Sequence, residues 1–197
     1  MSEYLLALRA DAARWCQGRW FIWRLPVLLY LAWAGFQNFR DPFYWHIFAG
    51  ITLGIHELGH AIFGFAGEFI SVAGGSLAQL AAPVIAALLF LRQRDYFGVA
   101  VAGAWLSLSL FHLAVYIGDA RAQVLPLVNI GGGEAEHDWF YLLTHTGLLA
   151  YDAQLAGLTR LAGFVTLLAS LLLGAWLCYL MARRNEESTG DKETLRR

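Results

Sequence analysis

Long apolar segments separated by short polar stretches dominate the pattern of this chain. A membrane-spanning helix needs about 20 predominantly apolar residues. The first apolar segment is the shortest, and Arg24 near its start can extend to the lipid headgroups. The pattern predicts an all-α, polytopic transmembrane helix bundle with about five spanning segments: Trp20 to Phe36, Phe43 to Ala66, Phe69 to Leu91, Tyr96 to Gly118 and Leu161 to Met181.

The segments that flank these runs have a different pattern. Residues 4–16 place apolar and charged side chains on opposite faces, which predicts an amphipathic helix on the membrane surface. Trp139 to Tyr151 is helical in pattern but too short to cross, so we place it at the interface. Residues 183–197 are almost entirely polar, which predicts a disordered tail. The predicted division is 1–19 interfacial helix, 20–182 transmembrane domain and 183–197 tail.

The basic residues indicate a side for each terminus, because arginines favour the cytoplasmic face. Four of them, from Arg9 to Arg24, precede or begin the first span, and a second group follows Met181. Both termini are therefore expected in the cytoplasm, which five crossings do not allow. Either the first span or the segment around Gly74 and Gly75 then crosses incompletely.

Composition agrees with an integral membrane protein. The 197 residues are 58% hydrophobic and 15% charged, whereas soluble domains are about 45–50% apolar and about 25% charged. The net charge of -1 gives no reason to expect a nucleic-acid partner. Cys16 and Cys178 lie too far apart for a metal knuckle or a disulfide framework, and we interpret both as packing residues.

The second apolar segment contains His56-Glu57-Leu58-Gly59-His60. On a helix, His56 and His60 share one face, about 6 Å apart along the axis, as two ligands of a single zinc ion require. Glu57 is then placed to take a proton from water activated by the metal. An ionisable group at the centre of a spanning helix costs about 2.5–3.5 kcal/mol, and bound metal can offset that cost. Haem is the weaker alternative, with His46 and His112 as axial ligands.

A catalytic zinc ion usually has three protein ligands, and four residues compete to be the third. Asp119 is the first choice, because it continues a polar face of the fourth span formed by Ser109, His112 and Tyr116. The alternatives are His137 and Asp138, which follow the glycine-rich loop at residues 131–133, and His112 itself. Each has a structural explanation too: Asp138, for example, can cap the helix that follows it.

The motif, its apolar setting and the Gly-Gly segment that follows it resemble the site-2 protease family of intramembrane zinc metalloproteases. The resemblance covers about residues 43–119. It implies zinc ligands at His56 and His60, an acid–base at Glu57, and a bacterial protein of the inner membrane. The Leu-Asp-Gly of that family is absent, and the candidates read Gly118-Asp119-Ala120 and His137-Asp138-Trp139.

We therefore expect a membrane-embedded zinc hydrolase, most simply an intramembrane endopeptidase acting on a transmembrane or membrane-proximal protein in contact with lipid. The third span carries Pro83, which predicts that part of it is unwound. A substrate segment would pair with its exposed backbone as an added strand. The residues that line this substrate-binding segment would be Gly74, Gly75, Ser76 and Gln79. The alternatives are a zinc hydrolase of lipids or small amides, and a metal-binding protein without catalysis.

Overall fold

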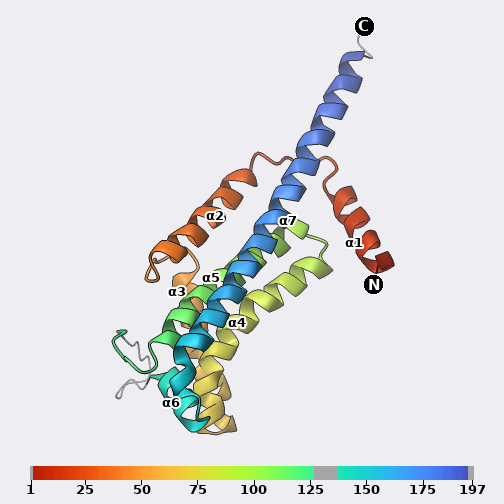
Figure 1. The fold of residues 1–197 in the computed structure, drawn as a ribbon. Helices are drawn as coiled ribbons and strands as arrows, with labels where there is room; N and C mark the ends of the chain where they lie inside the picture. Colours follow the sequence, from red (N-terminus) through yellow and green to blue (C-terminus); the bar gives the residue numbers. More distant parts are fainter. Residues whose placement is uncertain (1, 127–136, 195–197) are drawn as a thin grey trace.

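The computed structural model describes residues 2–126 and 137–194, and every regular element in this part of the chain is helical. The prediction of an all-α bundle is confirmed (Figure 1). The predicted loop glycines at 131–133 lie outside the described residues. In chain order the helices are α1 Ser2–Trp15, α2 Leu25–Arg40, α3 Ala49–Phe63, η1 Gly64–Ala66, α4 Glu68–Arg92, α5 Tyr96–Gly118, α6 Asp138–His145, η2 Leu149–Tyr151 and α7 Asp152–Thr194.

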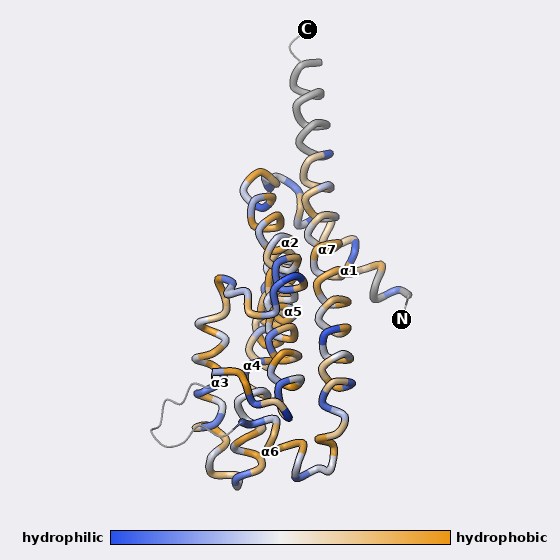
Figure 2. The backbone as a smooth tube through the Cα atoms, turned by 60° about the vertical axis from the view of Figure 1, so that its left-hand side comes forward, coloured by the Kyte–Doolittle hydropathy of each residue, from blue (hydrophilic) through white to orange (hydrophobic). Residues whose placement is uncertain are grey.

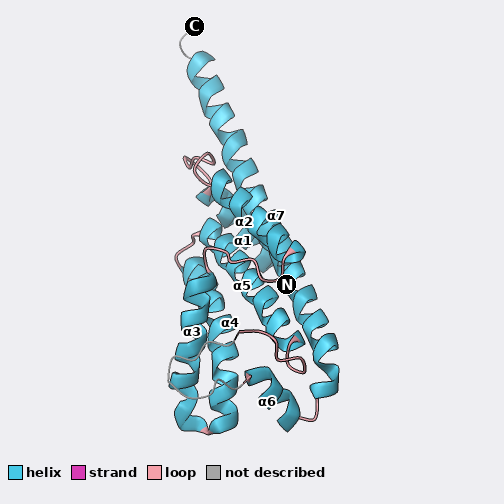
Figure 3. Ribbon diagram, turned by 90° about the vertical axis from the view of Figure 1, so that its left-hand side faces the viewer, coloured by secondary structure: helices cyan, strands magenta, loops and turns pink. Residues whose placement is uncertain are grey.

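Helix α5 is the centre of the bundle. It packs along α7 on one side and against α4 on another, and α4 in turn carries α3. Figure 3 shows α3 and α4 side by side, with α6 near their lower ends. Ala100, Ala102 and Ala104 are buried on α5, and such small residues let neighbouring helices approach closely. Hydrophobic positions extend along the whole bundle (Figure 2).

Among the described residues, three helical segments are long and apolar enough to cross a membrane: Glu68–Arg92, Tyr96–Gly118 and Leu149–Arg183. This supports a membrane protein, and the helices of the first two predicted spans are shorter than expected. Helices α2 and α3 have only 16 and 15 residues. The chain leaves the helical conformation at Asp41, which is extended (φ -127°, ψ 103°) because it precedes Pro42. Helices α2 and α3 then follow one another in the same direction (Figure 1).

The predicted unwinding of the Gly-Gly segment is also wrong, since α4 is helical throughout and contains Pro83. Its glycines serve close packing instead. A Cβ on Gly59 of α3 would collide with the carbonyl oxygen of Gly74, and a Cβ on Gly74 would lie 2.7 Å from the carbonyl oxygen of Gly59. The absence of side chains at these two positions lets α3 and α4 meet backbone to backbone.

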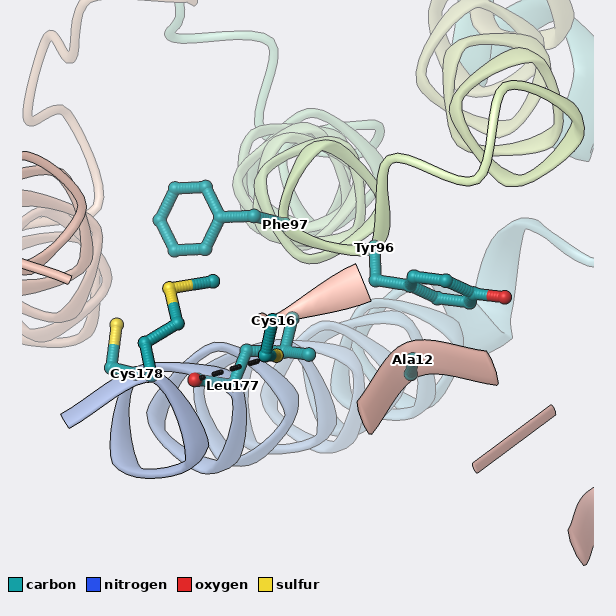
Figure 4. Close-up of a cluster of buried hydrophobic side chains, with 7 residues drawn as sticks. Ala12, Cys16, Tyr96, Phe97, Leu177 and Cys178 are labelled. Carbon is teal, nitrogen blue, oxygen red and sulfur yellow. Dashed lines mark hydrogen bonds between the residues drawn. The ribbon is translucent and has the colours of Figure 1, made fainter. Parts of the chain in front are cut away.

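The amphipathic helix expected at residues 4–16 is confirmed as α1. Its buried face packs on the ends of α5 and α7, where Cys16 lies against the Leu177 carbonyl (Figure 4). Both cysteines are buried and unbridged, as their interpretation as packing residues predicted. The cluster comprises Ala12, Cys16, Tyr96, Phe97, Leu177, Cys178 and Met181.

The carboxyl-terminal region differs from its predicted boundaries. The interfacial helix is shorter than Trp139 to Tyr151, because α6 ends at His145 and Gly147 has a positive φ of 71°. Helix α7 continues to Thr194 and so extends past residue 183, where the predicted tail begins. The reason is physical: arginine, glutamate and lysine are good helix formers, and they extend a helix that is already nucleated.

Candidate metal centre

Three side chains from two separate helices meet at one point. His56 and His60 come from consecutive turns of α3, and Asp138 is the first residue of α6. Oδ2 of Asp138 lies 3.0 Å from Nε2 of His56 and 3.3 Å from Nε2 of His60. The three potential ligand atoms all lie within 4.8 Å of one another. Two imidazoles and a carboxylate are a ligand set of catalytic zinc sites.

Hydrogen bonds at the far side of each imidazole fix its orientation. Nδ1 of His56 donates to Oε1 of Gln79 over 3.0 Å. Nδ1 of His60 donates to the carbonyl oxygen of Ser71 over 2.9 Å. With each proton on Nδ1, the lone pairs of both Nε2 atoms face Asp138. Hydrogen bonds of this kind orient metal-binding histidines and raise their basicity.

The predicted lining residues of α4 support the histidines and form no open backbone edge. The amide nitrogen of Gln79 donates to the Ser109 carbonyl on α5 over 3.1 Å, which holds its oxygen toward His56. Ser76 accepts a hydrogen bond from the indole of Trp139 over 3.2 Å, joining α4 to α6. Because these side chains are buried and bonded, the expected role of this segment in pairing with a substrate strand is not supported.

Gly75 keeps the space between the two imidazoles open. A Cβ on Gly75 would lie 2.5 Å from Nε2 of His60 and 2.7 Å from Nε2 of His56. Those are the atoms that would bind a metal, so even a methyl group would compete for the ligand position. The residues present therefore fit a small metal ion by donor chemistry, by orientation and by available space.

Asp138 is held by its own backbone and by its neighbours. Its amide donates to the hydroxyl of Tyr116 on α5 over 3.1 Å. His137 caps α6, because its Nδ1 accepts a hydrogen bond from the Phe140 amide over 3.2 Å. Burial opposes ionisation of Asp138. When His56 and His60 also carry a proton on Nε2, their hydrogen bonds to Asp138 outweigh that effect and lower the pKa of its carboxyl group.

The first choice for the third ligand, Asp119, does not join this group. Its carboxylate accepts hydrogen bonds from the amides of Val124 and Leu125, each over 3.0 Å, in the turn that follows α5. Oδ2 of Asp119 also lies 3.3 Å from Nε2 of His137. Asp119 therefore stabilises the turn after α5 and lies against His137 at the start of α6. Asp138 is the residue that reaches the motif histidines.

The remaining alternative, His112, is also directed elsewhere. Its Nε2 donates to the Tyr44 carbonyl over 3.2 Å, and its ring lies 4.5 Å from that of His46, centroid to centroid. Two imidazoles in direct contact leave no room for a macrocycle between them, so the haem interpretation is wrong as well. Neither His46 nor His112 belongs to the group that surrounds Asp138.

Glu57 lies beside the metal ligands rather than among them. It follows His56 directly on α3 and is half-buried. The His60 side chain is 26% exposed, compared with 8% for His56 and 12% for Asp138, so the group is least covered by protein on the side of His60. The Glu57 carboxylate is near enough to His60 to interact with it electrostatically.

Sequence reasoning missed the contacts that position the ligands. The carbonyl of Ser71 carries no signal in the sequence, since every residue has one. Tyr116 had a signal, because it shares the polar face of α5 with Ser109, but its hydroxyl binds the backbone of Asp138 and not a metal. Comparison with protein-family models, with curated proteins and with solved structures gave no match.

Proposed function

We propose that this chain is a membrane-embedded zinc-dependent hydrolase in which His56, His60 and Asp138 hold one zinc ion. The observation that supports this most is the convergence of two Nε2 atoms and one carboxylate oxygen within 4.8 Å. Both Nδ1 atoms are already bonded on the opposite side. A pair of structural histidines requires neither a shared carboxylate nor a glycine facing both of its Nε2 atoms.

The chemistry follows from the ligand set and its neighbour. A zinc ion held by His56, His60 and Asp138 would supply Lewis acidity for a carbonyl group and for water. Glu57, adjacent to His56, would act as the general base that accepts a proton from water at the site. The partial exposure of His60 provides access for water and substrate.

Within this class, we infer that the reaction is peptide hydrolysis in the membrane. The His-Glu-x-x-His motif on α3 carries this inference through its resemblance to the site-2 proteases. A transmembrane substrate must unwind first, because its amides are already hydrogen-bonded within the helix. The same resemblance implies the bacterial inner membrane as the location, and the arginine-rich segments near both termini favour its cytoplasmic side.

Two measurements on purified protein test the proposal. Zinc content is measured by mass spectrometry, and hydrolysis is measured with a fluorogenic peptide that includes an unwound transmembrane segment. Glu57→Gln is expected to keep one zinc per chain and to lose hydrolysis by about 100-fold or more, since general-base catalysis contributes about 10²–10⁴-fold.

Asp119→Asn is the matched control, because it alters a carboxylate outside the group and is expected to keep zinc. Zinc bound normally by both variants, with no peptide hydrolysis even in the unchanged protein, would contradict the peptidase assignment. An unchanged protein without stoichiometric zinc would contradict the hydrolase proposal altogether.

A further inference from the structure

Arginines are concentrated at one end of the molecule. Seven of the ten arginines up to Arg183 lie at the end that carries α1, the start of α2 and the α4–α5 turn (Figure 1). In α1, the start of α2 and the α4–α5 turn, the acidic residues are Glu3, Asp11 and Asp95. All seven except the half-buried Arg24 are exposed: Arg9, Arg14, Arg19, Arg24, Arg92, Arg94 and Arg183.

Several of these guanidinium groups are held in place while they remain accessible. Arg14 and Arg94 both bind Oδ1 of Asp11 over 3.0 Å, yet their side chains are 65% and 72% exposed. Arg19 donates to the Trp15 carbonyl over 2.8 Å and lies 4.4 Å from the centre of its ring. A fixed, exposed array of this kind is suited to binding anions.

Large apolar side chains surround the same arginines. Trp20 is 60% exposed, Trp23 is 80% exposed and Leu6 on α1 is 61% exposed. Exposed tryptophans next to arginines are typical of a membrane–water interface, where the rings lie at the depth of the headgroups. The partner that fits both features is a phospholipid with an anionic headgroup.

The opposite end has the reverse charge and lies closer to the metal centre. Glu68 begins α4, Asp119 directly follows α5 and Asp152 begins α7, where it is paired with Arg121 over 2.6 Å. Ser109, which anchors Gln79, lies 13 residues after Tyr96 and nine before Gly118. At 1.5 Å per residue, the site is about 20 Å from the arginine-rich end of α5 and about 14 Å from the other.

We propose that the arginine-rich end binds anionic phospholipid headgroups of the cytoplasmic leaflet, which leaves the metal centre in the half of the membrane that faces away from the cytoplasm. Cytoplasmic segments carry an excess of arginine, and the cytoplasmic leaflet attracts such clusters. Helix α1 and the Arg183 turn of α7 share this end, so one orientation satisfies both termini. The inference that substrate is cleaved in the non-cytoplasmic half of the membrane rests on the proposed hydrolase function. The inferred lipid contact and orientation do not depend on it.

Labelling of cysteines in intact bacterial cells with a membrane-impermeant maleimide tests the orientation. The unchanged protein is the baseline, because Cys16 and Cys178 are 1% and 7% exposed and are expected to stay unlabelled. Thr144→Cys, exposed near the end of α6, is expected to react in intact cells. Gln17→Cys, exposed beside α1, is expected to react only after permeabilisation. The reverse pattern, or equal labelling of both, would overturn the proposal.

Removal of charge tests whether the arginines set this orientation. Combining Arg9→Gln, Arg19→Gln and Arg92→Gln is expected to lower the ratio of Thr144→Cys to Gln17→Cys labelling in intact cells at least about threefold. Arg40→Gln with Arg160→Gln is the matched control, because these arginines lie outside the cluster. An unchanged ratio in the triple variant, or an equal loss in the control, would overturn the role of the cluster.

A lipid measurement on the unchanged protein keeps the proposal testable if the triple variant does not fold. Thermal unfolding is compared in vesicles of phosphatidylcholine, with and without phosphatidylglycerol, and in phosphatidylcholine vesicles with inorganic phosphate. A higher Tm only with phosphatidylglycerol is the expected result. Equal Tm values, or the same increase with inorganic phosphate, would contradict a lipid-headgroup site. Zinc content in these samples reports separately on the proposed hydrolase.

Discussion

Two pairs of histidines in this bundle differ in every feature that matters for metal binding. In the His56–His60 pair, both Nδ1 atoms donate hydrogen bonds and both Nε2 atoms face a carboxylate. In the His46–His112 pair, the rings lie against each other and the partner of His112 is a backbone carbonyl. All four side chains are buried or half-buried, whereas converging lone pairs opposite an acid occur in only one pair.

The tautomer of His46 sharpens this contrast. Its Nδ1 accepts a hydrogen bond from the Phe48 amide over 3.2 Å, so the proton is on Nε2. Among the described residues this buried Nε2 has no hydrogen-bond partner, and a protonated nitrogen cannot bind a metal. The lesson is that the hydrogen bond on the remote ring nitrogen decides whether an imidazole is available as a ligand.

Removing the shared carboxylate should have the largest effect on zinc binding, because it removes the acid that distinguishes the His56–His60 pair from the His46–His112 pair. Asp138→Ala is expected to weaken zinc binding more than about 100-fold. Substitution of residues that only hydrogen-bond to the ligands already lowers metal affinity about 10–100-fold, and Asp138 is proposed as a ligand itself. The measurement is a competition titration with a chromogenic zinc chelator. Asp119→Ala is the matched control and should bind zinc normally; an equal loss in both variants would contradict the assignment of Asp138.

Filling the space between the imidazoles should have the next largest effect. Gly75→Ala places a methyl group 2.5 Å from Nε2 of His60 and so is expected to abolish stoichiometric zinc binding. Gly157→Ala is the control for helix content, since nothing lies within 4 Å of that position. Zinc content, measured at equal helicity by circular dichroism, decides the outcome. Normal zinc content in Gly75→Ala would show that the metal lies elsewhere.

Changing the residue that holds the remote nitrogen of His56 should have a smaller effect. Gln79→Leu removes the acceptor for Nδ1 and is expected to weaken zinc binding about 10–100-fold. Gln79→Glu keeps an acceptor oxygen and should restore most of the affinity. Comparison of zinc dissociation constants for the two variants separates positioning of His56 from packing. Equal affinity in both would exclude a positioning role.

Changes in the second histidine pair should have the smallest effect on metal. His112→Ala is expected to keep zinc affinity within about twofold, because its ring contacts His46 and the Tyr44 carbonyl. Loss of this hydrogen bond between α5 and the segment that joins α2 to α3 should lower stability by about 1 kcal/mol. Zinc titration and thermal unfolding of the same sample test both parts. A large loss of zinc affinity in His112→Ala would contradict the claim that only the His56–His60 pair contributes to metal binding.

The sequence predicted the local features of the fold better than those that depend on tertiary contacts. The motif helix, α4 and α5 followed from apolar length, and the shared face of His56 and His60 followed from helical spacing. The continuity of α4 depends on its close contact with α3 at Gly59 and Gly74, which no local pattern reveals. The break between α2 and α3 did have a local signal in Pro42.

The choice between Asp119 and Asp138 could not be made from spacing along α5. Asp119 shares a helical face with Ser109 and Tyr116. Its carboxylate, however, accepts hydrogen bonds from the amides of Val124 and Leu125, in the turn that follows α5. Asp138 reaches the site because α6 packs against both α4 and α5. The position of α6 is a tertiary feature, so the sequence offered both residues and favoured the one that does not reach the motif histidines.

X-ray absorption at the zinc edge of the purified, zinc-loaded protein tests the central claim most directly. The ligand set predicts two imidazoles and a carboxylate oxygen at about 2.0–2.2 Å. The imidazole scattering should fall by half in His56→Ala. A sulfur shell at about 2.3 Å, or a zinc spectrum without imidazole scattering, would contradict the assignment of His56, His60 and Asp138.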